Sequence, residues 1–219
     1  MAEKLGVYIH IPFCKAKCDY CDFYSLPERE GTMDDYLKAL VAHIRETAPL
    51  AKGWQVDTVY IGGGTPSYFG AKRISALLGE IKKRFSVTRD AEITCEANPE
   101  SADLKFLRAI RRAGVNRLSL GMQSACDAEL HAIHRLHDFS QVVSAVQWAR
   151  KVKFKNLSLD LIYGLPGQDM TTWQKSLEAA LSMEPEHLSC YGLKVEPGTA
   201  LDGRVMRGEV LPDDDVQAD

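Results

Sequence analysis

Residues 117–123 carry the sequence RLSLGMQ, and the alternation within it decides the fold. The apolar side chains at every second position share one face of a strand, while Ser119, Gly121 and Gln123 share the other face. Residues 156–163, NLSLDLIY, alternate in a similar way. An open parallel sheet covered by helices on both sides would instead show nearly continuous apolar runs. We therefore expect a barrel whose inner face is polar and holds a ligand.

Short apolar runs alternate with helix-like segments along the rest of the chain, which is the βα pattern. Strands are expected at residues 5–12, 57–62, 92–98, 117–123, 156–163 and 187–194. The longer helices that follow are expected to start at Thr32, Ser101, Ser140 and Thr172, with one more over 74–85 and a short one over 127–136. Gly114 should end the helix that starts at Ser101. Six strands are few for closure, so the prediction is an α/β fold with a partial (β/α)6 TIM-like barrel.

The composition is that of an ordinary globular domain. Hydrophobic residues make up 45% of the 219 residues, charged residues make up 26%, and the net charge is -3. This balance gives no basic footprint for nucleic acid. The sequence contains no run of about 20 apolar residues that could span a membrane. The first residues lack the pattern of a signal peptide. A cytoplasmic location is the expectation.

Three of the six cysteines, Cys14, Cys18 and Cys21, lie within eight residues directly after the first strand. A [4Fe–4S] cluster held by only three thiolates keeps one iron open for a substrate or cofactor. Zinc bound with His10 as a fourth ligand and a thioredoxin-like pair of Cys18 and Cys21 are the alternatives. The three remaining cysteines are expected to be small core residues: Cys95, Cys126 and Cys190.

Further polar and glycine positions fall at the ends of successive strands. The run GGGTP occupies residues 62–66 at the end of the second strand. Consecutive glycines allow the backbone to approach a ligand, although a tight turn alone would explain them. Glu96, Gln123 and Asp160 lie on the polar faces of three strands, toward their C-terminal ends. In barrels this rim carries the catalytic and binding groups, so we expect these side chains to gather there with the cysteine loop.

Several motifs together resemble one known family. They are YIHIPFC at 8–14 running into CxxxCxYC, GGGTP at 62–66, EANP at 96–99, GMQS at 121–124 and DLIYGLPG at 160–167. The sequence from residue 8 to about residue 214 resembles the oxygen-independent coproporphyrinogen III oxidase family of the radical S-adenosylmethionine (SAM) superfamily. Within that family it is most similar to the HemW-like branch, whose members are regarded as heme chaperones.

The resemblance implies roles for individual residues. The cluster ligands would be Cys14, Cys18 and Cys21. The SAM contacts would be Tyr8, Tyr20, Gly63, Gly64, Thr65, Glu96, Gln123, Arg135 and Asp160. Among them Arg135 suits a carboxylate and Asp160 suits ribose hydroxyls. Without the resemblance, a solvated helix end is the preferred interpretation of Arg135 in HRLH (134–137). The three-residue spacing of His131, His134 and His137 is only a weak signal for a metal-binding helix face, and that interpretation is disfavoured.

One departure from the family bears on function. In the oxidases of this family the cysteines follow a CxxxCxxCxC pattern, whereas this sequence has Phe23 at the position of the last cysteine. The interpretation is therefore a heme chaperone that passes heme to acceptor proteins, and the alternative is a coproporphyrinogen III dehydrogenase. The resemblance implies a [4Fe–4S] cluster, SAM and a heme or porphyrinogen, with a flavodoxin or ferredoxin as reductant. Membrane contact is expected only through acceptors, and no nucleic acid is expected.

The resemblance also divides the chain. Residues 1–195 would form the radical SAM barrel, and residues 196–219 would begin the link to a C-terminal region. In the chaperone branch that region carries an HNxxYW-type sequence associated with heme binding. We accordingly expect the chain to be C-terminally truncated.

Overall fold

The computed structural model describes residues 3–27 and 29–218 and contains a six-stranded parallel sheet. The strands follow one another in the order of the chain: β1 (Glu3–Ile11), β4 (Trp54–Gly63), β5 (Val87–Ala97), β6 (Arg117–Gln123), β7 (Leu157–Tyr163) and β8 (His187–Gly192). Each neighbouring pair is parallel, so each connection is a crossover that returns the chain to the same end of the sheet. All six expected strands are present, and the sheet is a half-barrel.

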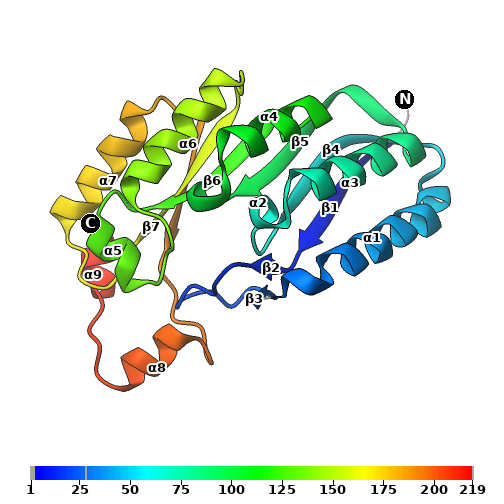
Figure 1. Cartoon of the computed structure of the whole chain (residues 1–219). Coiled ribbons are helices and arrows are strands. Elements are labelled where there is room, and N and C mark those ends of the chain that lie inside the picture. The colour runs from blue at the N-terminus through cyan, green and yellow to red at the C-terminus, as the bar shows by residue number, and fades with distance from the viewer. Residues whose placement is uncertain (1–2, 28, 219) are drawn as a thin grey trace.

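The helices form a layer along one side of this sheet (Figure 1). They are α1 (Met33–Thr47), α2 (Pro66–Phe69), α3 (Ala71–Arg84), α4 (Leu104–Ala113), α5 (Asp127–Ala132), α6 (Phe139–Lys151) and α7 (Met170–Ser182). The described residues also form three short 3₁₀ turns: Glu30–Thr32, Ala48–Ala51 and Pro99–Ser101. Consecutive long helices contact each other, as α1 with α3 and α3 with α4. None of the helices in the described part of the chain is long and apolar enough to cross a membrane.

The strand alternation that predicted the barrel holds in the structure. The apolar side chains of β6 are fully buried beneath the helix layer, as are the leucines of β7. The opposite face of these two strands carries Ser119, Gln123, Ser158 and Asp160. Burying the apolar face stabilises the sheet by about 25 cal/mol per Å² of apolar surface removed from water. The polar face is therefore available for a ligand.

Three of the expected helix starts are wrong, because aspartates cap these helices. Ser101, Ser140 and Thr172 were the expected starting positions. The caps are instead the residues whose carboxylates accept a backbone N–H three positions on: Asp103, Asp138 and Asp169. A carboxylate also interacts favourably with the positive end of the helix dipole. The serine and threonine lie two or three residues away from these caps.

Three other helix ends agree with the predictions to different degrees. Thr32 does precede α1, but its hydroxyl donates to the carbonyl of Arg29 at 2.8 Å and makes no capping bond to the helix. Gly114 ends α4 with a left-handed φ of 113°, as predicted. The short helix expected over 127–136 stops earlier, at Ala132. This early end redirects the chain toward the inner face of the sheet.

The chain after β8 folds back over the end of the sheet. It contains α8 (Ala200–Met206) and α9 (Asp214–Ala218), and Figure 1 shows α8 on the side of the cysteine loop. Leu201 of α8 is fully buried. Its backbone N–H donates to the carbonyl oxygen of Asp19 at 2.8 Å. The helix α8 is thus packed against the loop that carries the three cysteines.

Candidate functional site

A cavity of about 660 Å³ opens at the C-terminal ends of the strands. Eleven of the twelve residues proposed from the sequence line it: Cys14, Cys18, Cys21, Tyr20, Gly63, Gly64, Thr65, Glu96, Gln123, Arg135 and Asp160. Tyr8 is not among the lining residues. The residue is 59% exposed, and its hydroxyl lies 3.1 Å from Nδ1 of His10. The topology therefore brings together residues spread over nearly 150 positions of sequence.

The cysteine loop is held at both ends by a small parallel pair of strands. β2 (Phe13–Cys14) pairs with β3 (Leu26–Pro27), and the N–H of Leu26 donates to the carbonyl of Pro12. The ring of Phe13 is buried and stacks on Phe69 of α2 at a centroid distance of 5.6 Å. Sequence analysis missed this pairing because two-residue strands show no alternation. The loop is therefore anchored to the sheet end and to α2.

Two donors lie at the thiols. The hydroxyl of Thr65 donates to Sγ of Cys14 at 3.4 Å, and Nη1 of Arg135 donates to Sγ of Cys18 at 3.5 Å. Burial raises the pKa of the Cys14 thiol above its ordinary value, although the Thr65 hydroxyl opposes this shift. Burial likewise raises the pKa of Cys21. Binding of a metal deprotonates a coordinating thiol outright, so these thiols suit metal ligation better than free thiolate chemistry.

The alternative of zinc with His10 as a fourth ligand finds no support in the geometry. Nε2 of His10 lies 2.8 Å from the carbonyl of Tyr24, and Nδ1 lies 3.1 Å from the Tyr8 hydroxyl. Both ring nitrogens are thus engaged away from the cysteines. In residues 3–27 and 29–218, no three His, Cys, Asp or Glu side chains are arranged around a position for a single metal ion.

The histidines with three-residue spacing do not share a face. His137 is buried, with Nε2 at 3.2 Å from the carbonyl of Met122, whereas His134 is exposed and pairs with Asp19. The early end of α5 separates them, because His134 adopts a left-handed φ of 55°. The spacing therefore does not indicate a metal-binding face.

The glycine run makes the closest backbone approach in the site. Gly63 has a left-handed φ of 114°. A Cβ added to Gly64 would lie 2.9 Å from Sγ of Cys14 and 2.9 Å from the carbonyl oxygens of Ile11 and Phe13. The N–H of Gly64 donates to that Ile11 carbonyl at 2.7 Å. Only glycine fits this position, since backbone atoms cannot move aside.

Glu96 lies beside the glycine run with both carboxylate oxygens bonded. Oε1 accepts from the Tyr60 hydroxyl at 2.6 Å, and Oε2 accepts from the N–H of Gly63 at 3.0 Å. Burial raises the pKa of Glu96, while these two donors oppose that shift. Tyr60 is a residue of the site that sequence analysis missed. Its position two residues before Gly62, on the same face of β4, is the signal that was present.

Asp160 and Gln123 occupy the middle of the inner face. Both carboxylate oxygens of Asp160 lie 3.1 Å from the hydroxyl of Ser119, which lines the same cavity. Burial raises the pKa of Asp160, and Ser189 and Ser119 oppose the shift. Gln123 has a left-handed φ of 64°, and the pairing of β6 with β7 shifts register just before it. Such a bulge at a strand end redirects a side chain, here toward the cavity.

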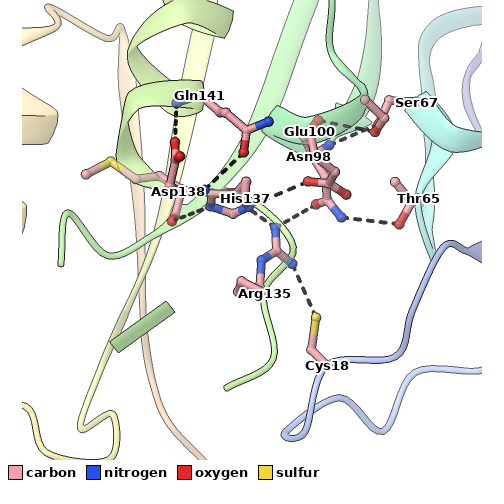
Figure 2. Close-up of polar contacts among 12 residues, drawn as sticks. Cys18, Thr65, Ser67, Asn98, Glu100, Arg135, His137, Asp138 and Gln141 are labelled. Atoms are coloured by element: carbon pink, nitrogen blue, oxygen red, sulfur yellow. Dashed lines mark hydrogen bonds and ion pairs between the residues drawn. The ribbon is translucent and has the colours of Figure 1, made fainter. Parts of the chain in front are cut away.

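Arg135 is buried, so its interpretation as a solvated helix end is wrong. Figure 2 shows its guanidinium between Cys18 and Asn98. Nη2 donates to Oδ1 of Asn98 at 2.8 Å and to the carbonyl of Gly121 at 3.1 Å. The buried Nε has no protein partner. A buried guanidinium with an unused donor is suited to an anionic group.

Not every cysteine outside the loop is a core residue. Cys95 is fully buried in β5 as expected, but Cys126 is only half-buried and Cys190 is exposed. Cys190 lies on β8, the last strand of the half-barrel, and lines the cavity. The expectation of a core position for Cys190 is wrong because an edge strand has no further strand beyond it to cover it.

A profile described as the radical SAM superfamily matches residues 8–180, which include the cysteine loop, the end of β1 and the whole of β4, β5, β6 and β7. The chain belongs to the radical SAM superfamily. Its sequence is 43% identical over 99% of its length to a Mycobacterium tuberculosis protein named heme chaperone HemW, covering 56% of that protein. It is 38% identical to the Escherichia coli heme chaperone HemW, with 97% of this chain and 56% of that protein aligned.

A solved structure of a radical SAM enzyme, coproporphyrinogen III oxidase (HemN) from Escherichia coli, has a TM-score of 0.91 and 30% identity to this chain. The match covers all of this chain and 51% of that one. The chain is thus a radical SAM protein with a partial TIM-like barrel. It spans about half the length of the curated relatives it matches.

The radical SAM superfamily implies a [4Fe–4S] cluster and SAM, and the residues present fit both. Three thiols line the cavity, and among the described residues no His, Asp or Glu side chain joins them around a single ion. Gly63 and Gly64 have no side chains, so their backbone is accessible to a ligand in the cavity. The buried Nε of Arg135 has no hydrogen-bond partner in the protein. A volume of about 660 Å³ also falls within the usual range of roughly 300–1,000 Å³ for small-molecule sites.

Proposed function

We propose that this chain is the cofactor-binding part of a heme chaperone. One observation carries the proposal: the three closely spaced cysteines share a single cavity with Glu96 and Arg135 at the strand ends. In the proposed arrangement Cys14, Cys18 and Cys21 ligate a [4Fe–4S] cluster, and SAM fills the remainder of the cavity. When bound, these two groups supply one-electron and radical chemistry.

The protein's own residues bind and orient SAM in this proposal. Gly63, Gly64 and Thr65 offer bare backbone for its amino end, and the Arg135 guanidinium matches its carboxylate. Asp160, held by Ser119, offers two carboxylate oxygens to the ribose hydroxyls. Tyr20 packs against the buried cluster of Ile133, Ile162 and Leu165, which makes an apolar wall for the adenine. Tyr8 does not line the cavity, so its proposed role rests on the resemblance alone.

Two features favour heme transfer over porphyrinogen chemistry. Phe23 occupies the position of the fourth cysteine in the CxxxCxxCxC pattern of the oxidases. Phe23 is exposed and lines the cavity. The relatives with the higher identity are named heme chaperones. Heme acceptor proteins and a reductant protein are the partners that this function requires, and a cytoplasmic location remains the expectation.

Porphyrinogen oxidation is the second candidate, favoured by the structural match to coproporphyrinogen III oxidase. The fold and cavity do not distinguish heme transfer from porphyrinogen oxidation, because one site can serve different substrates. A turnover assay with coproporphyrinogen III distinguishes the two functions.

Cluster binding is tested first, by anaerobic reconstitution of the chain. We expect about four irons and four sulfides per chain and a change in the EPR spectrum when SAM is added. Cys14→Ala, Cys18→Ala and Cys21→Ala should each lose the cluster, whereas Cys126→Ala should retain it. A variant with Cys14, Cys18 and Cys21 all replaced by Ala that still binds full iron and sulfide would contradict the proposal.

Heme transfer is tested next on the full-length protein, with heme, SAM, a reductant and coproporphyrinogen III. A chaperone should take up about one heme per chain and pass it to an apo acceptor, without releasing carbon dioxide. Many turnovers to protoporphyrinogen, with carbon dioxide released, would replace heme transfer by the oxidase function.

A further inference from the structure

The buried carboxylate of Asp19 lies inside the cysteine loop, directly after Cys18. It is only 5% exposed and has two side-chain partners from distant parts of the chain. Oδ2 accepts from Nη1 of Arg204 at 2.5 Å, and Oδ1 lies 2.8 Å from Nδ1 of His134. A buried carboxylate without partners is costly, so these contacts determine where the loop can lie.

The backbone of Asp19 is bonded as well. Its N–H donates to the carbonyl of Ile133 at 3.2 Å, and its carbonyl accepts from the N–H of Leu201 at 2.8 Å. Both backbone groups and both carboxylate oxygens of this one residue therefore have partners outside the loop. Two of these four partners belong to α8, and two belong to the turn after α5.

Arg204 connects these two regions. The same Nη1 that binds Asp19 also donates to the carbonyl of Ala132 at 2.5 Å, and Nε donates to Oε2 of Glu209 at 2.6 Å. Leu201, one turn earlier on α8, is fully buried. The guanidinium thus joins the cysteine loop, the end of α5 and the segment after α8. His134, by contrast, is 73% exposed on its side chain, so it cannot replace the half-buried charge of Arg204.

We infer that Arg204, acting through Asp19, is a positioning residue for the cluster ligands. Asp19 stands between Cys18 and Cys21, so holding its backbone holds the spacing of those two thiols before any cofactor binds. The same contacts hold the turn that leads into Arg135, which donates to Cys18. The inference rests on the proposed function only in taking the three thiols as cluster ligands.

A consequence is that cluster binding and the docking of α8 are coupled. If the docked helix favours the loop conformation that binds the cluster, the bound cluster favours the docked helix by the same factor. Backbone amides of residues 199–206 should then exchange with deuterium more slowly in cluster-loaded protein than in cluster-free protein.

The test compares Arg204→Ala with Arg207→Ala, an exposed arginine just after α8 that serves as the matched control. In cluster-free protein, Arg204→Ala should speed deuterium exchange of residues 14–21 by about tenfold or more, as expected for an unpaired buried carboxylate. In loaded protein it should speed the removal of cluster iron by a chelator to a similar extent. Arg207→Ala should match wild type in both measurements, and Arg204→Lys should restore most of the iron retention.

Asp19→Asn provides a second route, because it keeps the shape of the side chain while removing its charge. It should reproduce both effects, and the double variant should be no worse than either single variant, since the two substitutions remove the same interaction. If Arg204→Ala fails to fold, Asp19→Asn alone tests the positioning role of the Arg204–Asp19 pair.

The two proposals fail in different ways. Wild-type protein that takes up no cluster overturns the proposed function, while the exchange of residues 14–21 in cluster-free variants still tests the positioning role. Wild-type protein that takes up a cluster, with loop exchange and iron loss within twofold of wild type in Arg204→Ala and Asp19→Asn, overturns the positioning role alone.

Discussion

The guanidinium of Arg135 donates to the side-chain oxygen of Asn98 at 2.8 Å, which joins the turn after α5 to the end of β5. Asn98 in turn donates from Nδ2 to the Thr65 hydroxyl at 3.3 Å, and that hydroxyl donates to Cys14. Figure 2 shows this chain of contacts running from Arg135 to Thr65. The cysteine loop is thus bonded at two of its thiols to one polar network.

Replacing Arg135 by Lys should destabilise the fold. A lysine cannot bond the Asn98 oxygen, the Gly121 carbonyl and Cys18 at once, so buried acceptors lose their donor at a cost of about 1–3 kcal/mol in the free energy of unfolding. Urea unfolding measures this cost, with Arg112→Lys on the exposed side of α4 as control. Equal stability of the two variants would contradict a structural role for the network.

Gly64→Ala and Gly79→Ala should have opposite effects. The new Cβ at position 64 meets a thiol and two carbonyl oxygens at 2.9 Å, which should lower stability by roughly 1–3 kcal/mol and prevent cluster binding. Gly79 lies in α3 with nothing within 4 Å of the added Cβ, so alanine there should stabilise by about 0.5–1 kcal/mol. Thermal unfolding and iron content measure both, and a Gly64→Ala protein with full iron would refute the close approach.

Tyr60→Phe should weaken SAM binding while leaving the iron content unchanged. The Tyr60 hydroxyl is a donor to Glu96, and hydrogen bonds to charged groups contribute about 1.5–3 kcal/mol. Its loss should raise the SAM dissociation constant by roughly tenfold or more in anaerobic calorimetry. It should also raise the pKa of Glu96 further, since this donor opposes the effect of burial. Tyr24→Phe, at an exposed ring, serves as control; similar affinities in both variants would exclude this role for Tyr60.

Glu80 should contribute to stability at neutral pH and lose that contribution in acid. Hydrogen bonds from Arg45 and Arg84 lower its pKa from 4.5 to about 2. A lowered pKa means that the folded state binds the proton more weakly than the unfolded state, so the stabilisation is complete above pH 4.5 and disappears as the pH falls toward 2. The difference in unfolding free energy between wild type and Glu80→Gln should shrink over that interval, and a constant difference would argue against the ion pairs.

Strand order and strand identity could be predicted because their signals are local. The alternation in 117–123 and the connections long enough for crossover helices already require parallel neighbours in a polar-faced sheet. Helix starts were predicted less well. Ser101, Ser140 and Thr172 compete as caps with nearby aspartates, and only the observed hydrogen bonds identify Asp103, Asp138 and Asp169.

By itself the sequence determined the thiol spacing, the glycine run and which side chains lie on the polar faces of the strands. Each of these depends on residues a few positions apart. Only the tertiary structure decided that Arg135 is buried, that Tyr60 bonds Glu96 and that Arg204 reaches Asp19 from the far end of the chain. The physical reason is that a carboxylate or guanidinium is buried only where a partner is present, and curvature of the half-barrel brings those partners together from distant positions in the sequence.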